Sequence, residues 1–229
     1  MNKASSRKVV VTRPEPGLSD TLARLRERGW HAMSCPVMVI QPAETLPLIE
    51  GDALVITSAQ ALPALAEQPK ERLLLTVGEK TADRARQAGF TQVRAARGKR
   101  EGLVALCRAH GLSGERVSFV CGCGWRGQAY SRTVADQLGA RWVKGYQVQR
   151  ASCLAKEAVQ ALSERDVEAI CFYSAETVRA FLSLCPASLI AALPNVRAVC
   201  LSEAIAAEAR EIVWREVCFG DPLAVLGSP

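Results

Sequence analysis

The chain reads Leu54-Val55-Ile56-Thr57-Ser58-Ala59-Gln60-Ala61-Leu62 and, in its second half, Ile170-Cys171-Phe172-Tyr173-Ser174-Ala175-Glu176-Thr177-Val178. Each stretch starts as an apolar strand, stops at a Ser-Ala pair and continues as a helix. A second matching pair follows, over residues 75–82 and 199–206. This repetition predicts two similar α/β halves with a cleft between them. Helix N-termini that open onto such a cleft favour anions.

Strand and helix patterns alternate along all 229 residues. We expect strands over residues 8–12, 37–40, 53–57, 73–77, 116–120, 141–149, 167–173, 196–201 and 214–219, and a short one near Val93. We expect helices over residues 18–28, 59–66, 79–88, 101–110, 127–138, 155–163, 177–184 and 203–212. The helix at 59–66 contains Pro63 and is expected to be short or distorted. Such alternation is typical of parallel sheets flanked by helices, so the predicted fold class is α/β.

The two copies of the unit predict two domains, each a parallel sheet flanked by helices. The first strand and helix are too small to fold alone, so we expect residues 1–36 to join residues 151–229 in one discontinuous domain. Residues 37–150 would then form an inserted second domain. Two strands near 37–41 and 145–150 would cross between the domains as a two-stranded antiparallel linker.

Composition narrows the class of partner. The net charge is +6 with scattered arginines, and aromatic residues make up only 5% of the chain, so we expect no nucleic-acid binding. No apolar run reaches the roughly 18 residues of a membrane span, and the first eight residues are polar. Several of the nine cysteines lie in apolar strands, where thiols pack as small hydrophobes. We therefore expect a cytoplasmic protein with reduced thiols and no membrane contact.

A glycine-rich stretch, Gly122-Cys123-Gly124-Trp125-Arg126-Gly127, matches the GxGxxG pattern of dinucleotide-binding loops. It follows a predicted strand and precedes a predicted helix. The next strand ends without the acidic residue that usually holds the ribose, although Lys144 could face a 2′-phosphate. An NAD(P)-dependent oxidoreductase using Gly122, Gly124 and Gly127 therefore stays open as an alternative.

Metal chemistry has weak support in the sequence. Cys121 and Cys123 share one face of a strand end, but no histidine and no second cysteine pair lies nearby. His31 and His110, the only histidines, fall in no motif. We predict no metal site.

Three serines, Ser58, Ser174 and Ser202, each end a strand and open a helix. The simplest role is a helix N-cap, which stabilises by about 1 kcal/mol and needs no ligand. The same hydroxyls and free N–H groups can also hold carboxylates at the carboxyl edge of a sheet. Gly78 and Thr81 make a fourth site of this kind, and four at equivalent places favour carboxylate binding.

Tyr146 is one of three tyrosines and lies where the chain should leave the middle domain. It is either a half-buried linker residue or a phenol that faces the cleft. With a pKa near 10, a phenol donates a proton at neutral pH.

Taken in order, these motifs resemble those of the uroporphyrinogen-III synthase family over nearly the whole chain. The matching stretches are Val11-Thr12-Arg13-Pro14, Thr57-Ser58-Ala59-Gln60-Ala61, Val77-Gly78-Glu79-Lys80-Thr81-Ala82, Ser174-Ala175-Glu176-Thr177-Val178-Arg179-Ala180-Phe181-Leu182 and Ser202-Glu203-Ala204-Ile205-Ala206. Tyr146 matches a conserved tyrosine of the family. The family usually reads Arg-Gly-x-Gly-Gly-Arg after the strand that ends at Val120, where this chain reads Cys121-Gly122-Cys123-Gly124-Trp125-Arg126.

The resemblance implies a lyase that closes hydroxymethylbilane to uroporphyrinogen III, inverting ring D through a spiro intermediate, as a monomer without a cofactor. Tyr146 would be the catalytic proton donor. The substrate-binding residues would be Thr12, Arg13, Ser58, Ala59, Gly78, Thr81, Gly122, Gly124, Arg126, Ser174, Ala175 and Ser202. Because the first family arginine is lost, a non-catalytic binder of a tetrapyrrole or another anion stays open as a second alternative.

Overall fold

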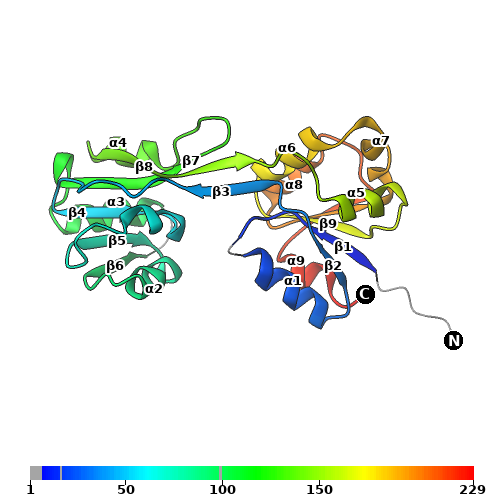
Figure 1. The fold of residues 1–229 in the computed structure, drawn as a ribbon, viewed down its shortest axis with the longest axis horizontal. Helices are drawn as coiled ribbons and strands as arrows, with labels where there is room; N and C mark the ends of the chain where they lie inside the picture. Colours follow the sequence, from blue (N-terminus) through cyan, green and yellow to red (C-terminus); the bar gives the residue numbers. More distant parts are fainter. Residues whose placement is uncertain (1–6, 16, 98–99) are drawn as a thin grey trace. The chain divides into compact units, whose positions relative to one another are not determined.

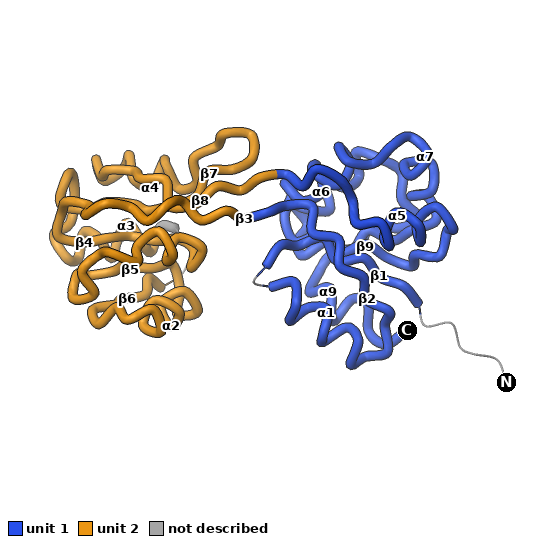
Figure 2. The backbone as a smooth tube through the Cα atoms, viewed as in Figure 1, with its two compact units in different colours: residues 1–39, 150–229 blue, residues 40–149 orange. Residues whose placement is uncertain are grey.

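Two sheets organise the chain (Figure 1). The computed structural model describes residues 7–15, 17–97 and 100–229. The chain divides into two compact units (Figure 2). Unit 1 combines the residues up to Val39 with Arg150–Pro229, and unit 2 is Ile40–Gln149. Each unit has its own sheet and its own buried core, so each is described by itself.

The sheet of unit 1 has five strands in the order β11-β10-β9-β1-β2, and every neighbouring pair is parallel. The strands are β1 (Lys8–Val11), β2 (His31–Ser34), β9 (Ala169–Phe172), β10 (Arg197–Cys200) and β11 (Glu216–Phe219). The helices are α1 (Leu18–Glu27), α5 (Lys156–Ser163), α6 (Ala175–Leu184), α7 (Ala187–Ile190), α8 (Glu203–Ala209) and α9 (Pro222–Leu226), with a 3₁₀ turn η4 (Leu193–Asn195). The strand order changes direction between β1 and β9, which is where open α/β sheets bind ligands.

The sheet of unit 2 has the order β3-β8-β7-β4-β5-β6. Its strands are β3 (Met38–Pro42), β4 (Ala53–Ile56), β5 (Leu73–Val77), β6 (Val93–Ala96), β7 (Val117–Cys123) and β8 (Arg141–Arg150). Its helices are α2 (Glu79–Gln87), α3 (Arg100–Ala109) and α4 (Arg132–Gln137), with 3₁₀ turns η1 (Ala59–Ala61), η2 (Pro63–Leu65) and η3 (Gly114–Arg116). The strands β4 to β8 pair in parallel, and their order reverses between β4 and β7.

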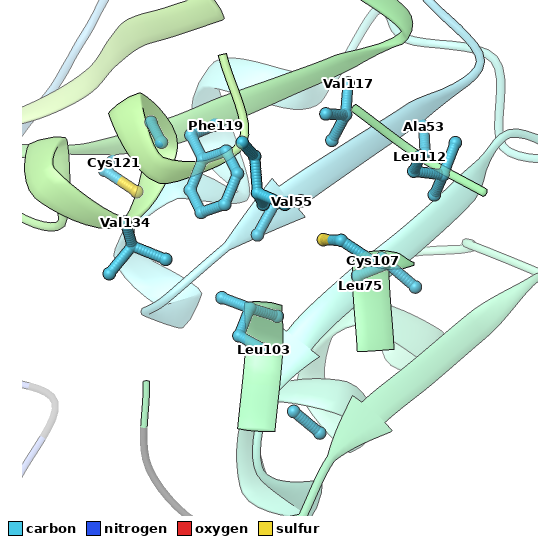
Figure 3. Close-up of a cluster of buried hydrophobic side chains, with 13 residues drawn as sticks. Ala53, Val55, Leu75, Leu103, Cys107, Leu112, Val117, Phe119, Cys121 and Val134 are labelled. Atoms are coloured by element: carbon cyan, nitrogen blue, oxygen red, sulfur yellow. The ribbon is translucent and has the colours of Figure 1, made fainter. Parts of the chain in front are cut away.

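Apolar strand residues fill the cores, as parallel sheets covered on both faces require. In unit 2, Val55, Phe119 and Cys121 pack with Leu103 of α3 and Val134 of α4 (Figure 3). In unit 1, Val9 and Val11 of β1 pack with Leu18, Leu22 and Leu25 of α1, which recur at helical spacing. The predicted α/β class with parallel sheets flanked by helices is confirmed.

Four local expectations differ from the structure. The strand β2 has no counterpart among the predicted strands, because His31-Ala32-Met33-Ser34 contains no β-branched residue, yet Ala32 pairs with Val9 and is buried. The helix expected over 127–138 begins only at Arg132. The expected helix at 59–66 is two 3₁₀ turns, η1 and η2, with Pro63 at the first position of the second. The short helices α7 and α9 have no counterpart among the predicted helices.

Candidate functional site

At the carboxyl end of β1, Thr12 and Arg13 lie beside the end of β9. The register places Val11 opposite Cys171, and the buried Thr12 hydroxyl donates a hydrogen bond of 2.7 Å to the Cys171 carbonyl. Thr12 therefore ties the ends of the two strands together. This is the position where the strand order of unit 1 reverses, so the predicted residues lie at the edge where open α/β sheets generally bind ligands.

Arg13 is held in place by aromatic and polar contacts. Its guanidinium lies 4.4 Å from the centre of the Tyr173 ring, and its Nη1 donates to the Thr21 hydroxyl at 3.3 Å. Burial raises the pKa of Tyr173, so this phenol stays neutral under the cation. The arrangement fixes a half-buried positive charge at the carboxyl edge of unit 1, which suits a carboxylate ligand.

The serines of unit 1 differ in what their hydroxyls do. Ser174 caps α6 in a capping box, in which its Oγ accepts from the Thr177 N–H at 3.1 Å and Thr177 Oγ1 accepts from the Ser174 N–H at 3.2 Å. Ala175 is the first residue of that helix. Ser202 occupies the N-cap position of α8 but is exposed, and its side chain makes no capping bond. The expected capping role therefore holds at Ser174 and is wrong at Ser202.

This difference gives a stability prediction. Ser174→Ala is expected to lower the free energy of unfolding by about 1 kcal/mol, because the Thr177 N–H loses its Ser174 Oγ acceptor, while the backbone N–H of residue 174 keeps its bond to Thr177 Oγ1. Ser202→Ala is expected to change it by less than about 0.5 kcal/mol, because an exposed hydroxyl without a bond is removed. Urea unfolding of both variants checks this, and equal losses would contradict the assigned capping geometry.

In unit 2, the strand order reverses between β4 and β7, and the predicted residues gather there. Ser58 follows β4, and its Oγ accepts from the Gln60 N–H at 3.3 Å as it caps η1, whose first residue is Ala59. The Ser58 side chain is close enough to the Tyr146 phenol to influence its pKa. Tyr146 lies on β8 and is only 6% exposed, and burial raises its pKa to about 12. The structure thus places the predicted proton donor near a predicted carboxylate holder.

Gly122 lies directly beneath the Tyr146 ring. The two residues are paired across β7 and β8, after a bulge between Cys121 and Gly122. A Cβ on Gly122 would lie 2.2 Å from Cε2 and Cζ of the Tyr146 ring. The glycine is therefore required by close approach of the ring.

This geometry argues against the dinucleotide alternative. In a dinucleotide loop, the glycines turn a strand directly into a helix whose N-terminus faces the phosphates. Here β7 continues through Cys123, and Gly124 to Gln128 form a hairpin in which the Gly124 N–H donates to the Gln128 carbonyl at 2.8 Å (Figure 1). The helix α4 starts eight residues after Gly124, so its N-terminus does not follow the glycines. The match to GxGxxG is therefore coincidental, because Gly122 belongs to β7 whereas Gly124 and Gly127 belong to the hairpin after it.

Gln147 of β8 holds the start of the hairpin, and further contacts lie within the hairpin itself. Gln147 Nε2 donates to the carbonyls of Cys123 and Gly124 at 3.2 and 3.0 Å. The Arg126 guanidinium is exposed and lies 5.8 Å from the centre of the Trp125 ring, while its backbone N–H donates to Gln128 Oε1. Gly122 lies near the end of β7, and Gly124 and Arg126 lie on the hairpin that follows this strand.

The remaining predicted residues lie at the end of β5, the neighbour of β4. Gly78 occupies the N-cap position of α2 with φ of +80°, a conformation that favours glycine. Its carbonyl accepts from the Thr76 hydroxyl at 3.2 Å. Thr81 is half-buried in the first turn of the same helix.

Within the described parts of the chain, no group of three or more His, Cys, Asp or Glu residues is arranged to hold a metal. The Cys121 side chain is buried in the core, where its sulfur lies 3.6 Å from Thr57 Oγ1, while Cys123 is half-buried. Among the described residues, no helix is both long enough and apolar enough to span a bilayer.

A family model described as "Uroporphyrinogen-III synthase HemD" matches residues 19–220. The chain belongs to the uroporphyrinogen-III synthase family. The family consists of cyclising lyases of tetrapyrrole biosynthesis, and the resemblance drawn from the sequence motifs is confirmed.

Two individual proteins illustrate the similarity. The Archaeoglobus fulgidus protein named "Putative uroporphyrinogen-III synthase" is 28% identical over 202 residues, which cover 85% of this chain and 84% of that protein. The crystal structure of uroporphyrinogen-III synthetase from Helicobacter pylori 26695 aligns over 95% of both chains with a TM-score of 0.62 at 17% identity. At this low identity, the match to the Helicobacter pylori structure shows a similar fold only.

All five family motifs in this chain fall at carboxyl ends of strands, after β1, β4, β5, β9 and β10. Sequence reasoning missed three residues that shape these edges, namely Tyr173, Gln147 and Tyr130. Tyr173 stacks on Arg13, Gln147 fixes the hairpin, and the Tyr130 ring lies 6.5 Å from the Tyr146 ring. Only Tyr173 gave a signal, since it directly precedes the Ser-Ala pair.

Proposed function

We propose that this chain converts hydroxymethylbilane to uroporphyrinogen III. The observation that carries the proposal is the cluster of Ser58, Gly122 and Tyr146 at the point where the strand order of unit 2 reverses. A buried phenol that stays neutral is a suitable proton donor for a leaving hydroxyl. The carboxyl edge of unit 1, with Arg13 fixed on Tyr173, supports binding of a polycarboxylate.

The chemistry needs little from the protein beyond positioning. The pyrrole electrons expel the hydroxyl as water, with Tyr146 donating the proton to it. The substrate must be held bent, so that the substituted carbon of ring D attacks the carbon that lost the hydroxyl and forms the spiro intermediate. Holding the two carbons in this geometry is catalysis by orientation. We propose that Thr12, Arg13, Ser58, Ala59, Gly78, Thr81, Gly122, Gly124, Arg126, Ser174, Ala175 and Ser202 bind the substrate, mainly through its carboxylates.

The decisive experiment supplies fresh hydroxymethylbilane and separates the product isomers. Spontaneous closure gives the type I ring, so the enzyme is expected to give an excess of type III. Product with no such excess would overturn the proposal. If the chain then still binds a tetrapyrrole, it is the non-catalytic binder.

Tyr146→Phe is expected to lower kcat by less than about 100-fold, because the substrate ionises readily and the donor only assists. The ratio of wild-type to variant kcat is expected to stay constant from pH 7 to 9, because a pKa of about 12 keeps the phenol protonated throughout. A pH–rate comparison checks this. A ratio that increased with pH would mean that the phenolate acts as a base.

The same pKa predicts an alkaline effect on stability. A phenol has a pKa near 10 when unfolded and about 12 here, so the fold favours its protonated form. The stabilisation is fully present below pH 10 and is lost as the pH rises toward 12. Urea unfolding of the wild type and Tyr146→Phe across this range checks it, and an equal loss of stability in both would contradict the assignment to Tyr146.

We also propose that the chain acts as a cytoplasmic monomer of two domains, linked by an antiparallel pair of strands near 37–41 and 145–150. Supporting this, β3 and β8 are neighbours in the sheet and the boundary between the units falls within both strands. Sedimentation at micromolar concentration tests the oligomeric state, and a dimer mass would overturn that part.

A further inference from the structure

Unit 2 contains a groove that no motif of the sequence marked. It has a volume of about 490 Å³ and lies between the η1–η2 segment and α2. Its apolar lining is Ala59, Leu62, Pro63, Ala66 and Ala88. Two cations, Lys70 and Arg84, complete the lining, and no acidic residue is part of it. A groove of this composition suits an anion that carries an apolar body.

Arg84 is the side chain in this groove that is available to a ligand. It is half-buried on α2, and among the described residues no hydrogen bond or ion pair reaches its guanidinium. On the same helix, Arg86 is exposed and pairs with Asp83 at 2.7 Å. Lys70 is already anchored, since its Nζ donates to the Leu65 carbonyl at 2.9 Å and lies 4.4 Å from the centre of the Phe90 ring.

The groove begins at the proposed substrate site. Thr81, Arg84 and Ala88 follow each other at spacings of three and four residues, so they share one face of α2. Arg84 is displaced from Thr81 by about 4.5 Å along the helix axis, which is about the reach of a short alkyl carboxylate. Ala59, at the other side of the groove, directly follows Ser58.

We propose that this groove holds one carboxylate-bearing side arm of the substrate and that Arg84 is a specificity-determining residue for it. The carbon chain of the arm would lie on Leu62, Pro63 and Ala66, and its carboxylate would accept hydrogen bonds from the Arg84 guanidinium. Lys70 adds positive potential without giving up its own contacts. The inference rests on the proposed function, because it takes the substrate to be a pyrrole polycarboxylate.

Binding and kinetics of Arg84→Met, Arg84→Lys and the control Arg86→Met test this. The binding probes are a porphyrin with eight carboxylates and one with four, followed by quenching of tryptophan fluorescence. Arg84→Met is expected to raise the Kd of the octacarboxylate porphyrin and the KM for hydroxymethylbilane about 5- to 10-fold each, with kcat within twofold. Arg84→Lys is expected to recover part of this loss, and Arg86→Met to behave as wild type.

The outcomes separate the two proposals. If wild type gives type III product but Arg84→Met matches Arg86→Met in Kd and KM, the groove assignment is wrong and the enzyme assignment stands. If wild type gives no type III product but Arg84→Met still weakens porphyrin binding, the enzyme assignment fails and the groove stands as a carboxylate site. A loss in Arg84→Met that Arg84→Lys does not relieve at all would also count against a charge-based role.

Discussion

Cys121→Arg, which restores the usual family residue, is expected to lower the free energy of unfolding by at least about 3 kcal/mol. The Cys121 side chain is fully buried and belongs to the core cluster with Phe119 and Val134 (Figure 3). A guanidinium there would meet the Thr57 hydroxyl and the apolar side chains of the cluster, which contains no carboxylate. An uncompensated buried charge is among the most destabilising single changes.

Urea unfolding of three variants checks this expectation. Cys121→Ala loses one buried sulfur and is expected to cost about 1 kcal/mol. Cys123→Arg, two residues along the same strand but half-buried, is expected to cost less than about 1 kcal/mol, because its charge can reach water. Equal losses for Cys121→Arg and Cys123→Arg would show that position 121 is not sealed from solvent.

This burial changes how the departure from the family pattern is tested. In a double variant with Cys121→Arg and Trp125→Gly, the loss of stability caused by the first change would mask any gain in activity caused by the second. Trp125→Gly alone is the cleaner change, because Trp125 lies on the hairpin that follows β7 and is half-buried. The sequence pattern predicted a strand that ends at Val120, whereas Cys121 is a core residue within β7.

Strand and helix alternation predicted the α/β class because hydrophobic periodicity is a local property of the sequence. The serine turns were equally readable, since Ser58 and Ser174 end apolar strands and cap the helical turns after them. Because the carboxyl ends of parallel strands lie at the same edge of a sheet, the predicted residues of each unit lie along one edge. The strand order reverses between β1 and β9 and between β4 and β7. These two positions could not be predicted from local sequence, because they depend on pairing between strands that are far apart in the chain.

The failures share a cause, which is that tertiary contacts override local pattern. β2 forms because Ala32 and Met33 are buried beside β1, although their propensity for strand is low. The glycine-rich stretch continues β7 because β8 pairs with it through Cys123. No local signal distinguishes that hairpin from a phosphate loop, and only the ring of Tyr146 over Gly122 explains the first glycine.

Gly122→Ala is expected to lower kcat/KM for hydroxymethylbilane on the order of 100-fold, because a small misplacement of reacting groups is costly. The new Cβ would lie 2.2 Å from the Tyr146 ring, so the ring must move. The phenol then moves away from Ser58 and shifts relative to the substrate. Overpacking of this kind is also expected to cost about 1–3 kcal/mol of stability.

A double-mutant cycle with Tyr146→Ala separates ring displacement from damage to the strand. If the clash with the ring is the cause, removing the ring makes room for the methyl group, and Gly122→Ala then costs less than about 0.5 kcal/mol in that background. If the cost stays the same in both backgrounds, the glycine is required by the β7 backbone and its bulge instead. In that case the loss of activity no longer reports on Tyr146, and the geometric argument for this phenol as the proton donor loses its main support.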